Sequence, residues 1–294
     1  MKSFLVFLLI DQFILFAAAL GKKANFFPRT KIWIFFFVPY PEILPQYREN
    51  RILFTTEAFF TELRLISSEN AYGPKFIDDH HRIDVFASLA DHADLPSWIR
   101  YYQRPNSSVG LFYGSPLIDD DGDVIIDIIL LDRFNFNVSR KKIQYRILNR
   151  DEIYRYSIEM KFFDMDIQDF YEKNLTSLVV EIFAKKLWKI DSNNHSIYLI
   201  RVLRPIDVGL RFPLNPEEKE GVVVQIGSTV TFSEKILRLK KETESIQNRS
   251  PCPKNFQTTS YEYVFREKNL FVDWCLFKLI DQSDQLEEKN ENHR

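Results

Sequence analysis

Apolar and polar residues alternate over short runs through the first half of the chain, between residues 47 and 151. Period-two alternation bounded by turn-forming residues is typical of β-strands with one buried face. Short strands at this spacing over about 100 residues predict a β-sandwich. The expected strands are Ile52–Thr55, Phe59–Ile66, Ile83–Phe86, Val109–Tyr113, Val124–Leu131 and Lys142–Leu148.

Two local features refine this sandwich. Trp98 is expected to fill the core between two sheets, with an exposed binding aromatic as the alternative. The acidic run Asp119–Asp123 is expected to form a hairpin turn, with Gly122 supplying a positive φ.

The pattern changes in the second half, residues 152–282, where strand-length apolar runs alternate with helical periodicity. Asp166 is expected to cap a helix of about 20 residues, and Thr231–Glu234 has the T-x-x-E form of a capping box. The order β-α-β-β-α-β predicts a ferredoxin-like domain whose helices cover one face of a four-stranded sheet. The four expected strands are Arg155–Phe162, Ser196–Leu203, Gly221–Gly227 and Leu270–Asp281.

The two ends of the chain differ from this body. Residues 1–20 combine Lys2, an apolar stretch and Ala17–Ala19, which predicts a secretory signal peptide, with a short membrane anchor as the alternative. Residues 21–46 form a leader or linker of unknown role, and its apolar run Ile32–Val38 is too short to span a bilayer. Residues 283–294 are expected to be a disordered acidic tail.

The overall charge favours neither nucleic acid nor anionic membrane, because 39 basic residues are balanced by 41 acidic ones. Export would place the two cysteines, Cys252 and Cys275, in an oxidising compartment. An even count of two then suggests one disulfide, with two free thiols as the alternative. Four N-x-[ST] sequons are predicted glycosylation sites: Asn106, Asn137, Asn174 and Asn194.

Few residues suggest chemistry. The acidic and imidazole groups of Asp78–His81, with Asp84, His92 and Asp94, are candidate Zn²⁺ ligands, but they lack HExxH spacing and paired cysteines. A solvated loop is the simpler interpretation. Asp119–Asp123 is a candidate Ca²⁺ site without the full EF-hand loop. Neither a P-loop nor a G-x-S-x-G nucleophile motif is present, so no catalytic residue is predicted.

Several segments nonetheless resemble a known family. Asp94–Arg104 (DLPSWIRYYQR) and Phe112–Ser115 (FYGS) are similar to the N-terminal cadherin-like (Ig-like) domain of alpha- and epsilon-sarcoglycan. The second half agrees at Phe212–Leu214, Lys219–Ser228 and Phe271–Cys275 (FVDWC). The resemblance covers roughly residues 47–281, with the motifs in the family's order.

This resemblance implies a non-enzymatic glycoprotein with no cofactor and no small-molecule substrate. Such subunits assemble with other sarcoglycans (beta and gamma/delta type) and help link the dystrophin–dystroglycan complex to the muscle cell surface. Cys275 matches the cysteine of the family's VDWC segment, and the implied partner is Cys252. The family carries one transmembrane helix after the ectodomain. No such segment follows Asp281 in this sequence, so either the sequence stops early or the product is secreted. The location that the resemblance implies is the outer face of the sarcolemma, with secretion as the alternative.

Two other function classes stay open on the sequence. An extracellular metal-dependent hydrolase would use His80, His81 and Asp84, and would contain stoichiometric metal. A Ca²⁺-dependent adhesion protein would use the predicted cadherin-like domain, and its stability would depend on Ca²⁺.

Overall fold

The computed structural model describes residues 48–65, 83–105, 107–133, 136–190, 196–247 and 259–282. The predicted signal peptide, leader and acidic tail lie outside these residues. So do Asp78–His81, Cys252, Asn106 and Asn194, and their predictions stay predictions.

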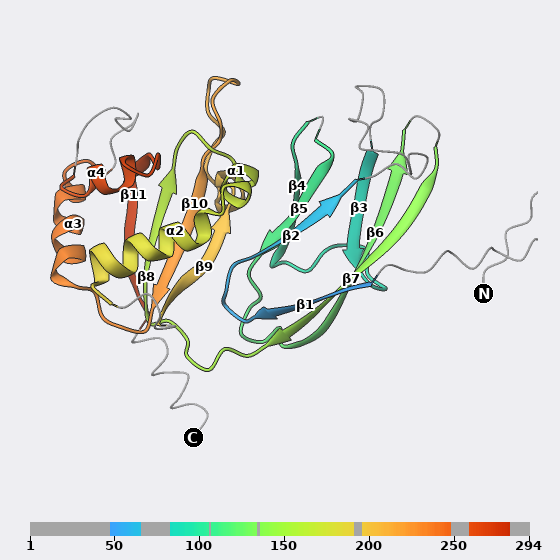
Figure 1. Ribbon diagram of the computed structural model, residues 1–294, viewed down its shortest axis with the longest axis horizontal. Coiled ribbons are helices and arrows are strands. Elements are labelled where there is room, and N and C mark those ends of the chain that lie inside the picture. The colour runs from blue at the N-terminus through green and yellow to red at the C-terminus, as the bar shows by residue number, and fades with distance from the viewer. Residues whose placement is uncertain are drawn as a thin grey trace, which may run out of the picture. The chain divides into compact units, whose positions relative to one another are not determined.

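The first half of the described chain contains two sheets (Figure 1). One is four-stranded in the order β1-β7-β6-β3, and the other is three-stranded in the order β2-β5-β4. β1 runs parallel to β7, while all other neighbouring strands in these sheets are antiparallel. The strands are β1 (Arg48–Phe54), β2 (Phe59–Arg64), β3 (Ile83–Leu89), β4 (Ile99–Gln103), β5 (Val109–Gly114), β6 (Gly122–Asp132) and β7 (Val138–Leu148).

The inward faces of both sheets share one hydrophobic core, as the alternation predicts. Ile126, Ile128 and Leu130 of β6 are buried at every second position, while Ile129 between them is exposed. Trp98 is 7% exposed and meets Phe59 edge to face at 5.8 Å between ring centroids, so its predicted role in the core is confirmed.

Two features of this half differ from the predictions. β4 was not predicted, because the four residues after the buried Ile99 are all half-buried and so lack a clean alternation. The predicted hairpin at Asp119–Asp123 is wrong: β5 and β6, which it connects, belong to different sheets. Gly122 does have the expected positive φ, at +122°.

The second half forms a four-stranded sheet in the order β11-β8-β10-β9, and every neighbouring pair is antiparallel. Helices α2 and α3 lie over one face of this sheet (Figure 1). The strands are β8 (Tyr156–Phe162), β9 (Ile197–Leu203), β10 (Val222–Ser228) and β11 (Val272–Asp281). The helical segments are α1 (Ile167–Glu172), α2 (Leu175–Ile182), the π-helical turn η2 (Phe183–Trp188), the 3-10 turn η3 (Pro205–Val208), α3 (Glu234–Glu244) and α4 (Glu262–Arg266).

The helices bury the apolar residues that the periodicity selects, but their ends differ from the predictions. Asp166 caps α1 as expected, in a reciprocal capping box with Asp169. The predicted single helix is interrupted at Asn174, which has the left-handed φ of +50° that asparagine tolerates better than most residues. Ser233, not Thr231, caps α3, because its hydroxyl accepts the Ile236 N–H at 3.3 Å.

β11 is irregular where it passes β8. Asp273 pairs with Lys161, but the next paired residue is Lys278, opposite Glu159, so the intervening residues form a bulge. Trp274 and Phe277 within this bulge are both buried in the core under the helices. The Trp274 indole N–H donates to the carboxylate of Glu262, which is only 3% exposed and also accepts from Arg266 at 2.6 Å. The bulge therefore directs two large rings into one core.

The core of the second half does not end at the sheet. Leu111 and Tyr113 of β5, in the first half, belong to the same buried cluster as Ile158 and Met160 of β8. Phe60 of β2 also packs against this cluster. The three-stranded sheet is therefore buried on both faces, one in each core.

Candidate functional site

The most extensive polar site within the described residues is the contact between the three-stranded sheet and the second half, here called the seam. It consists of the outward side chains of β2, β4 and β5 with Arg104 just after β4, the segments 55–58 and 150–154, and the residues of 166–172, β9 and 204–220 that they contact. Phe60 approaches Phe170 and Tyr171 of α1 at ring-centroid distances of 6.2 and 5.7 Å. These rings form its apolar part, and charged pairs surround them.

Arg104, just after β4, is the centre of the largest charged cluster. Its guanidinium binds both carboxylate oxygens of Asp166, with Nε–Oδ2 at 2.7 Å and Nη2–Oδ1 at 2.5 Å. Nη2 also lies 2.7 Å from Asp169 Oδ1, and Lys219 Nζ reaches Asp169 Oδ2 at 2.6 Å. The hydrogen bond to Asp166 is the largest cause of a raised Arg104 pKa, so this charge is permanent. Two acidic helix-cap residues are thus neutralised by two cations from outside the helix.

Asp169 shows how closely this cluster is balanced. Burial alone would raise the pKa of its carboxyl group. Hydrogen bonds from Lys219 and from the Asp166 backbone N–H, with the charges of Arg104 and Lys219, outweigh burial and lower that pKa. Asp169 is therefore ionised at neutral pH, and its charge stabilises the folded seam.

A second cluster joins β4 and β5 to the segment after β9. The Tyr113 hydroxyl donates to Asp207 Oδ2 at 2.7 Å, and burial, followed by the Asp207 charge, raises the pKa of Tyr113. Arg204 binds the buried carboxylate of Glu220 through two nitrogens, at 2.6 and 3.1 Å. The same guanidinium lies 4.6 Å from the Tyr102 ring centroid. These groups are held in place by one another.

The seam ends at Tyr198 of β9. Its hydroxyl lies 3.2 Å from Thr56 Oγ1 and accepts the Tyr154 backbone N–H at 3.2 Å. The Arg150 guanidinium lies 3.6 Å above the Tyr198 ring and donates to Glu57 Oε2 at 2.5 Å. The Ala58 N–H also donates to the Leu199 carbonyl at 2.9 Å. Backbone and side chains on either side of the connection at 149–155 are therefore directly bonded.

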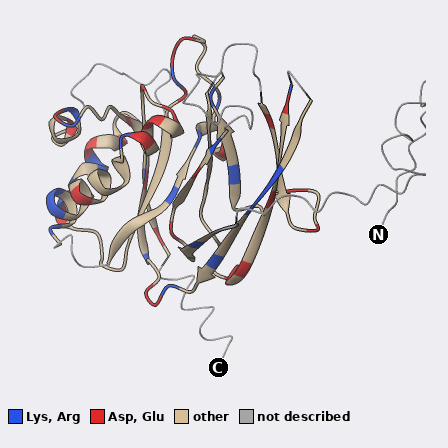
Figure 2. Cartoon of the chain, turned by 45° about the vertical axis from the view of Figure 1, so that its right-hand side comes forward, with Lys and Arg blue, Asp and Glu red and all other residues tan. Residues whose placement is uncertain are grey.

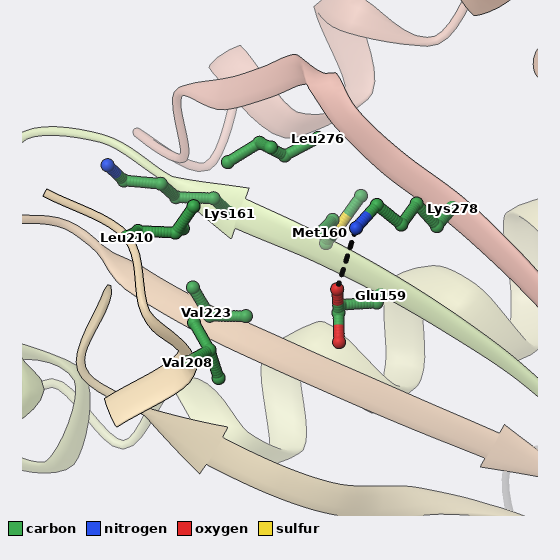
Figure 3. A pocket seen from close by; sticks show the side chains of 8 residues that line it. All are labelled: Glu159, Met160, Lys161, Val208, Leu210, Val223, Leu276 and Lys278. Atoms are coloured by element: carbon green, nitrogen blue, oxygen red, sulfur yellow. Dashed lines mark ion pairs between the residues drawn. The ribbon is translucent and has the colours of Figure 1, made fainter. Parts of the chain in front are cut away.

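The open face of the second sheet carries a shallow cavity of about 60 Å³, seen in Figure 3. Lys278 pairs with Glu159 across it at 3.8 Å, and Val208 and Leu210 approach it from the loop after β9. A site for a drug-sized ligand typically has several hundred Å³, so this cavity holds a few waters at most.

The predicted metal ligands are not gathered into a site where they are described. The structure places no group of three or more His, Cys, Asp or Glu side chains suited to a metal within its described ranges. Asp84 pairs with Arg133 at 2.6 Å, and His92 Nδ1 lies 2.9 Å from the Ala90 carbonyl. In the acidic turn, Asp120 accepts the Leu117 N–H at 2.8 Å, and Asp123 pairs with Arg146 at 3.1 Å.

Three other predicted residues can be located. Cys275, in the bulge of β11, is disulfide-bonded, while its predicted partner lies outside the described residues. Asn137 and Asn174 are both exposed, as glycan acceptors must be. None of the helices in the described ranges is both long and apolar enough to cross a bilayer.

The sequence did not predict the seam. Its charged residues look like ordinary surface charges, and only the fold brings Arg104 to Asp166, 62 positions along the chain. One signal was available: Arg104 closes the DLPSWIRYYQR segment on which the family resemblance depends.

A β-sandwich joined to a helix-backed antiparallel sheet through a charged seam defines a two-part scaffold, and comparison with known proteins identifies its class. The family model for the sarcoglycan alpha/epsilon N-terminal domain matches residues 72–149, and the model for the second domain of the same family matches residues 153–281. The chain belongs to the alpha/epsilon-sarcoglycan family.

Individual relatives agree with this assignment. Epsilon-sarcoglycan from Rattus norvegicus is 30% identical over 206 residues, which are 68% of this chain and 44% of the rat protein. Epsilon-sarcoglycan from Homo sapiens gives the same identity and coverage, and human alpha-sarcoglycan is 28% identical over 203 residues, 68% of this chain and 50% of that protein. The chain thus matches about half the length, or less, of these relatives.

Proposed function

We propose that this chain is a non-enzymatic, extracellular subunit of a sarcoglycan complex. The observation that carries the proposal is the match of both halves, in order, to the two domains of the alpha/epsilon-sarcoglycan family. Its expected partners are other sarcoglycans, of beta and gamma/delta type, and through them dystroglycan and the dystrophin-associated complex. The role is to link that assembly to the muscle cell surface and stabilise the membrane, without a cofactor.

The fold supports a finer description of the two domains. Two sheets around one core, with Trp98 between them, fit a cadherin-like sandwich over residues 47–151. The order β11-β8-β10-β9, with helices after the first and third strands of the domain, fits a ferredoxin-like domain over residues 152–282.

An extracellular location on the sarcolemma is part of the same proposal. It is supported by the disulfide-bonded state of Cys275, because disulfides persist in oxidising compartments. The exposed sequons at Asn137 and Asn174 and the signal-like residues 1–20 are consistent with entry into the secretory pathway.

The seam supports a scaffold more than an enzyme. Catalytic groups usually face a cavity and have pKa values poised for proton transfer. In the seam, by contrast, Arg104 and Arg204 neutralise Asp166 and Glu220, which are nearly buried. The Arg104–Asp166 pair holds the first domain against the second, as a rigid scaffold subunit requires.

Co-purification tests the assembly. The chain, fused to a membrane anchor, is co-expressed with beta-, gamma- and delta-type sarcoglycans and isolated through its own affinity tag in mild detergent. We expect stoichiometric recovery of these partners, whereas an anchored immunoglobulin-like domain, the control, recovers none. If the folded, glycosylated chain recovers none of them either, the proposal is wrong.

A further inference from the structure

A second cavity, of about 420 Å³, lies among the helical segments of the second domain, away from the seam. We call it the basic pocket. It is formed between the end of η2, the first turns of α3 and the start of α4. Its lining residues are Lys186, Lys235, Arg238, Ser260, Tyr261, Tyr263 and Val264.

Three cations with little compensation give this pocket its charge. Lys235 Nζ donates to the backbone carbonyl of Lys186 at 2.9 Å, so its charge meets a neutral group. Within the part of the chain that the structure describes, Lys186 and Arg238 have no carboxylate partner. Blue and red segments are mixed over the described elements in Figure 2, whereas the lining residues of this pocket include three cations and no carboxylate.

The neighbouring acidic residues offset only part of this charge. Glu242 accepts from the backbone N–H and the hydroxyl of Ser260, which lines the pocket, at 2.8 and 2.9 Å. Glu234, in the first turn of α3, is exposed to solvent and, like Lys186 and Arg238, is screened. Three cations and no carboxylate are among the pocket's lining residues, so the lining is positive and suited to an anion.

The remaining wall indicates what kind of anion. Tyr263 is 58% exposed, and Tyr261 beside it is half-buried, which raises the pKa of its hydroxyl and keeps it a hydrogen-bond donor. Tyrosine combines a flat apolar face, which suits the C–H face of a sugar ring, with a polar tip. A volume of about 420 Å³ falls within the range of ligand sites and exceeds what a bare sulfate needs.

We propose that the basic pocket binds a sulfated or carboxylated sugar unit of an acidic polysaccharide. Arg238 supplies a planar fork for a sulfate or carboxylate group, and Lys186 and Lys235 supply point charges for a second one. Tyr263 covers the ring. The inference uses only the chemistry of this pocket, and it holds whether or not the chain assembles with other sarcoglycans.

The first test measures binding of a heparin-derived hexasaccharide to the purified full chain by calorimetry at low and physiological salt. We expect the triple variant Lys186→Ala, Lys235→Ala, Arg238→Ala to bind about tenfold or more weakly, because it loses three charge-assisted contacts. The matched control, Lys240→Ala, Lys241→Ala, Lys268→Ala, removes the same net charge from exposed positions and should change affinity less than about threefold. Equal losses in both variants would overturn the proposal.

A second variant separates the sugar from other anions. Tyr263→Ala should weaken hexasaccharide binding by about threefold and leave the weak binding of inorganic sulfate unchanged, because only the ring contact is lost. The proposal is wrong if poly-glutamate or phosphatidylserine vesicles bind the pocket as tightly as the hexasaccharide does and Tyr263→Ala weakens the binding of none of them. Should the triple variant fail to fold by circular dichroism, the exposed single change Arg238→Gln replaces it, and an unchanged affinity would then count against the site.

Discussion

Replacing Arg104 with alanine should weaken the whole folded unit, because this one side chain neutralises two carboxylates across the seam. Asp166 and Asp169 have side chains only 11% and 10% exposed, so neither is well hydrated once its partner is gone. Breaking a fully buried ion pair from one side costs roughly 3–5 kcal/mol. Arg104 itself is 27% exposed, and Lys219 continues to neutralise Asp169. We therefore expect Arg104→Ala to lower the free energy of unfolding by about 2 kcal/mol.

Urea denaturation measures this loss without the salt screening that guanidinium would introduce. The matched control is Arg64→Ala, which removes an arginine that is 74% exposed and pairs with Glu62 at 2.5 Å. That exposed pair should contribute little to stability, because water screens it. Arg104→Lys should recover part of the loss, since it keeps the charge and gives up the two-pronged contact with Asp166.

The pH dependence gives an independent check. The pKa of Asp169 in the folded state lies below its unfolded value of about 3.9. Its charge therefore adds its full stability at pH values above the unfolded pKa. This contribution is lost as the pH falls through the folded pKa. The difference between wild type and Arg104→Ala should therefore be constant from neutral pH to about pH 5 and shrink in stronger acid. Our account of the seam fails if Arg104→Ala costs no more than Arg64→Ala, or if their difference does not change with acid.

Three further outcomes follow from the structure. Trp274→Phe keeps a ring in the core but leaves the buried Glu262 without one hydrogen-bond donor, so the free energy of unfolding in urea should fall by about 1–3 kcal/mol. A double variant that adds Glu262→Leu should recover part of this loss, because no buried carboxylate is then left unsatisfied. Cys275→Ser removes a disulfide and should lower the free energy of unfolding by about 3 kcal/mol if the bridge closes the predicted loop to Cys252. A reducing agent should lower the melting temperature of wild type and leave that of Cys275→Ser unchanged. Because Asp120 and Asp123 already hold a backbone N–H and an arginine, millimolar Ca²⁺ and chelator should give the same melting temperature by scanning calorimetry, and a rise of several degrees with Ca²⁺ would contradict this.

Local pattern predicted most elements of the fold, because burial on one face leaves a regular trace in sequence. β6 and α3 show this well, since their inward residues recur with periods of two and of three to four. β4 left no such trace, as its outward side chains are covered by the second domain. The acidic turn was assigned to a hairpin because a sequence cannot tell whether two consecutive strands pair or separate into different sheets.

The limits of the site prediction have the same origin. Arg104 and Asp166 are 62 positions apart, and a salt bridge between distant residues leaves no periodic signal. The bulge at Trp274–Phe277 is likewise invisible in an unbroken apolar run, where every residue is compatible with a strand. Residue types predicted which side chains each segment buries, whereas the pairs that charged residues form are visible only in the folded structure.

The buried position of Leu111 and Tyr113 has a consequence for work with fragments. These two side chains belong to one domain by sequence and to the other by packing. A recombinant fragment starting near residue 152 would expose to water the part of its core that Leu111 and Tyr113 cover. The complementary fragment would expose these two side chains as part of an apolar patch prone to aggregation. Variants and binding fragments of this chain are therefore best studied on a product that spans both halves.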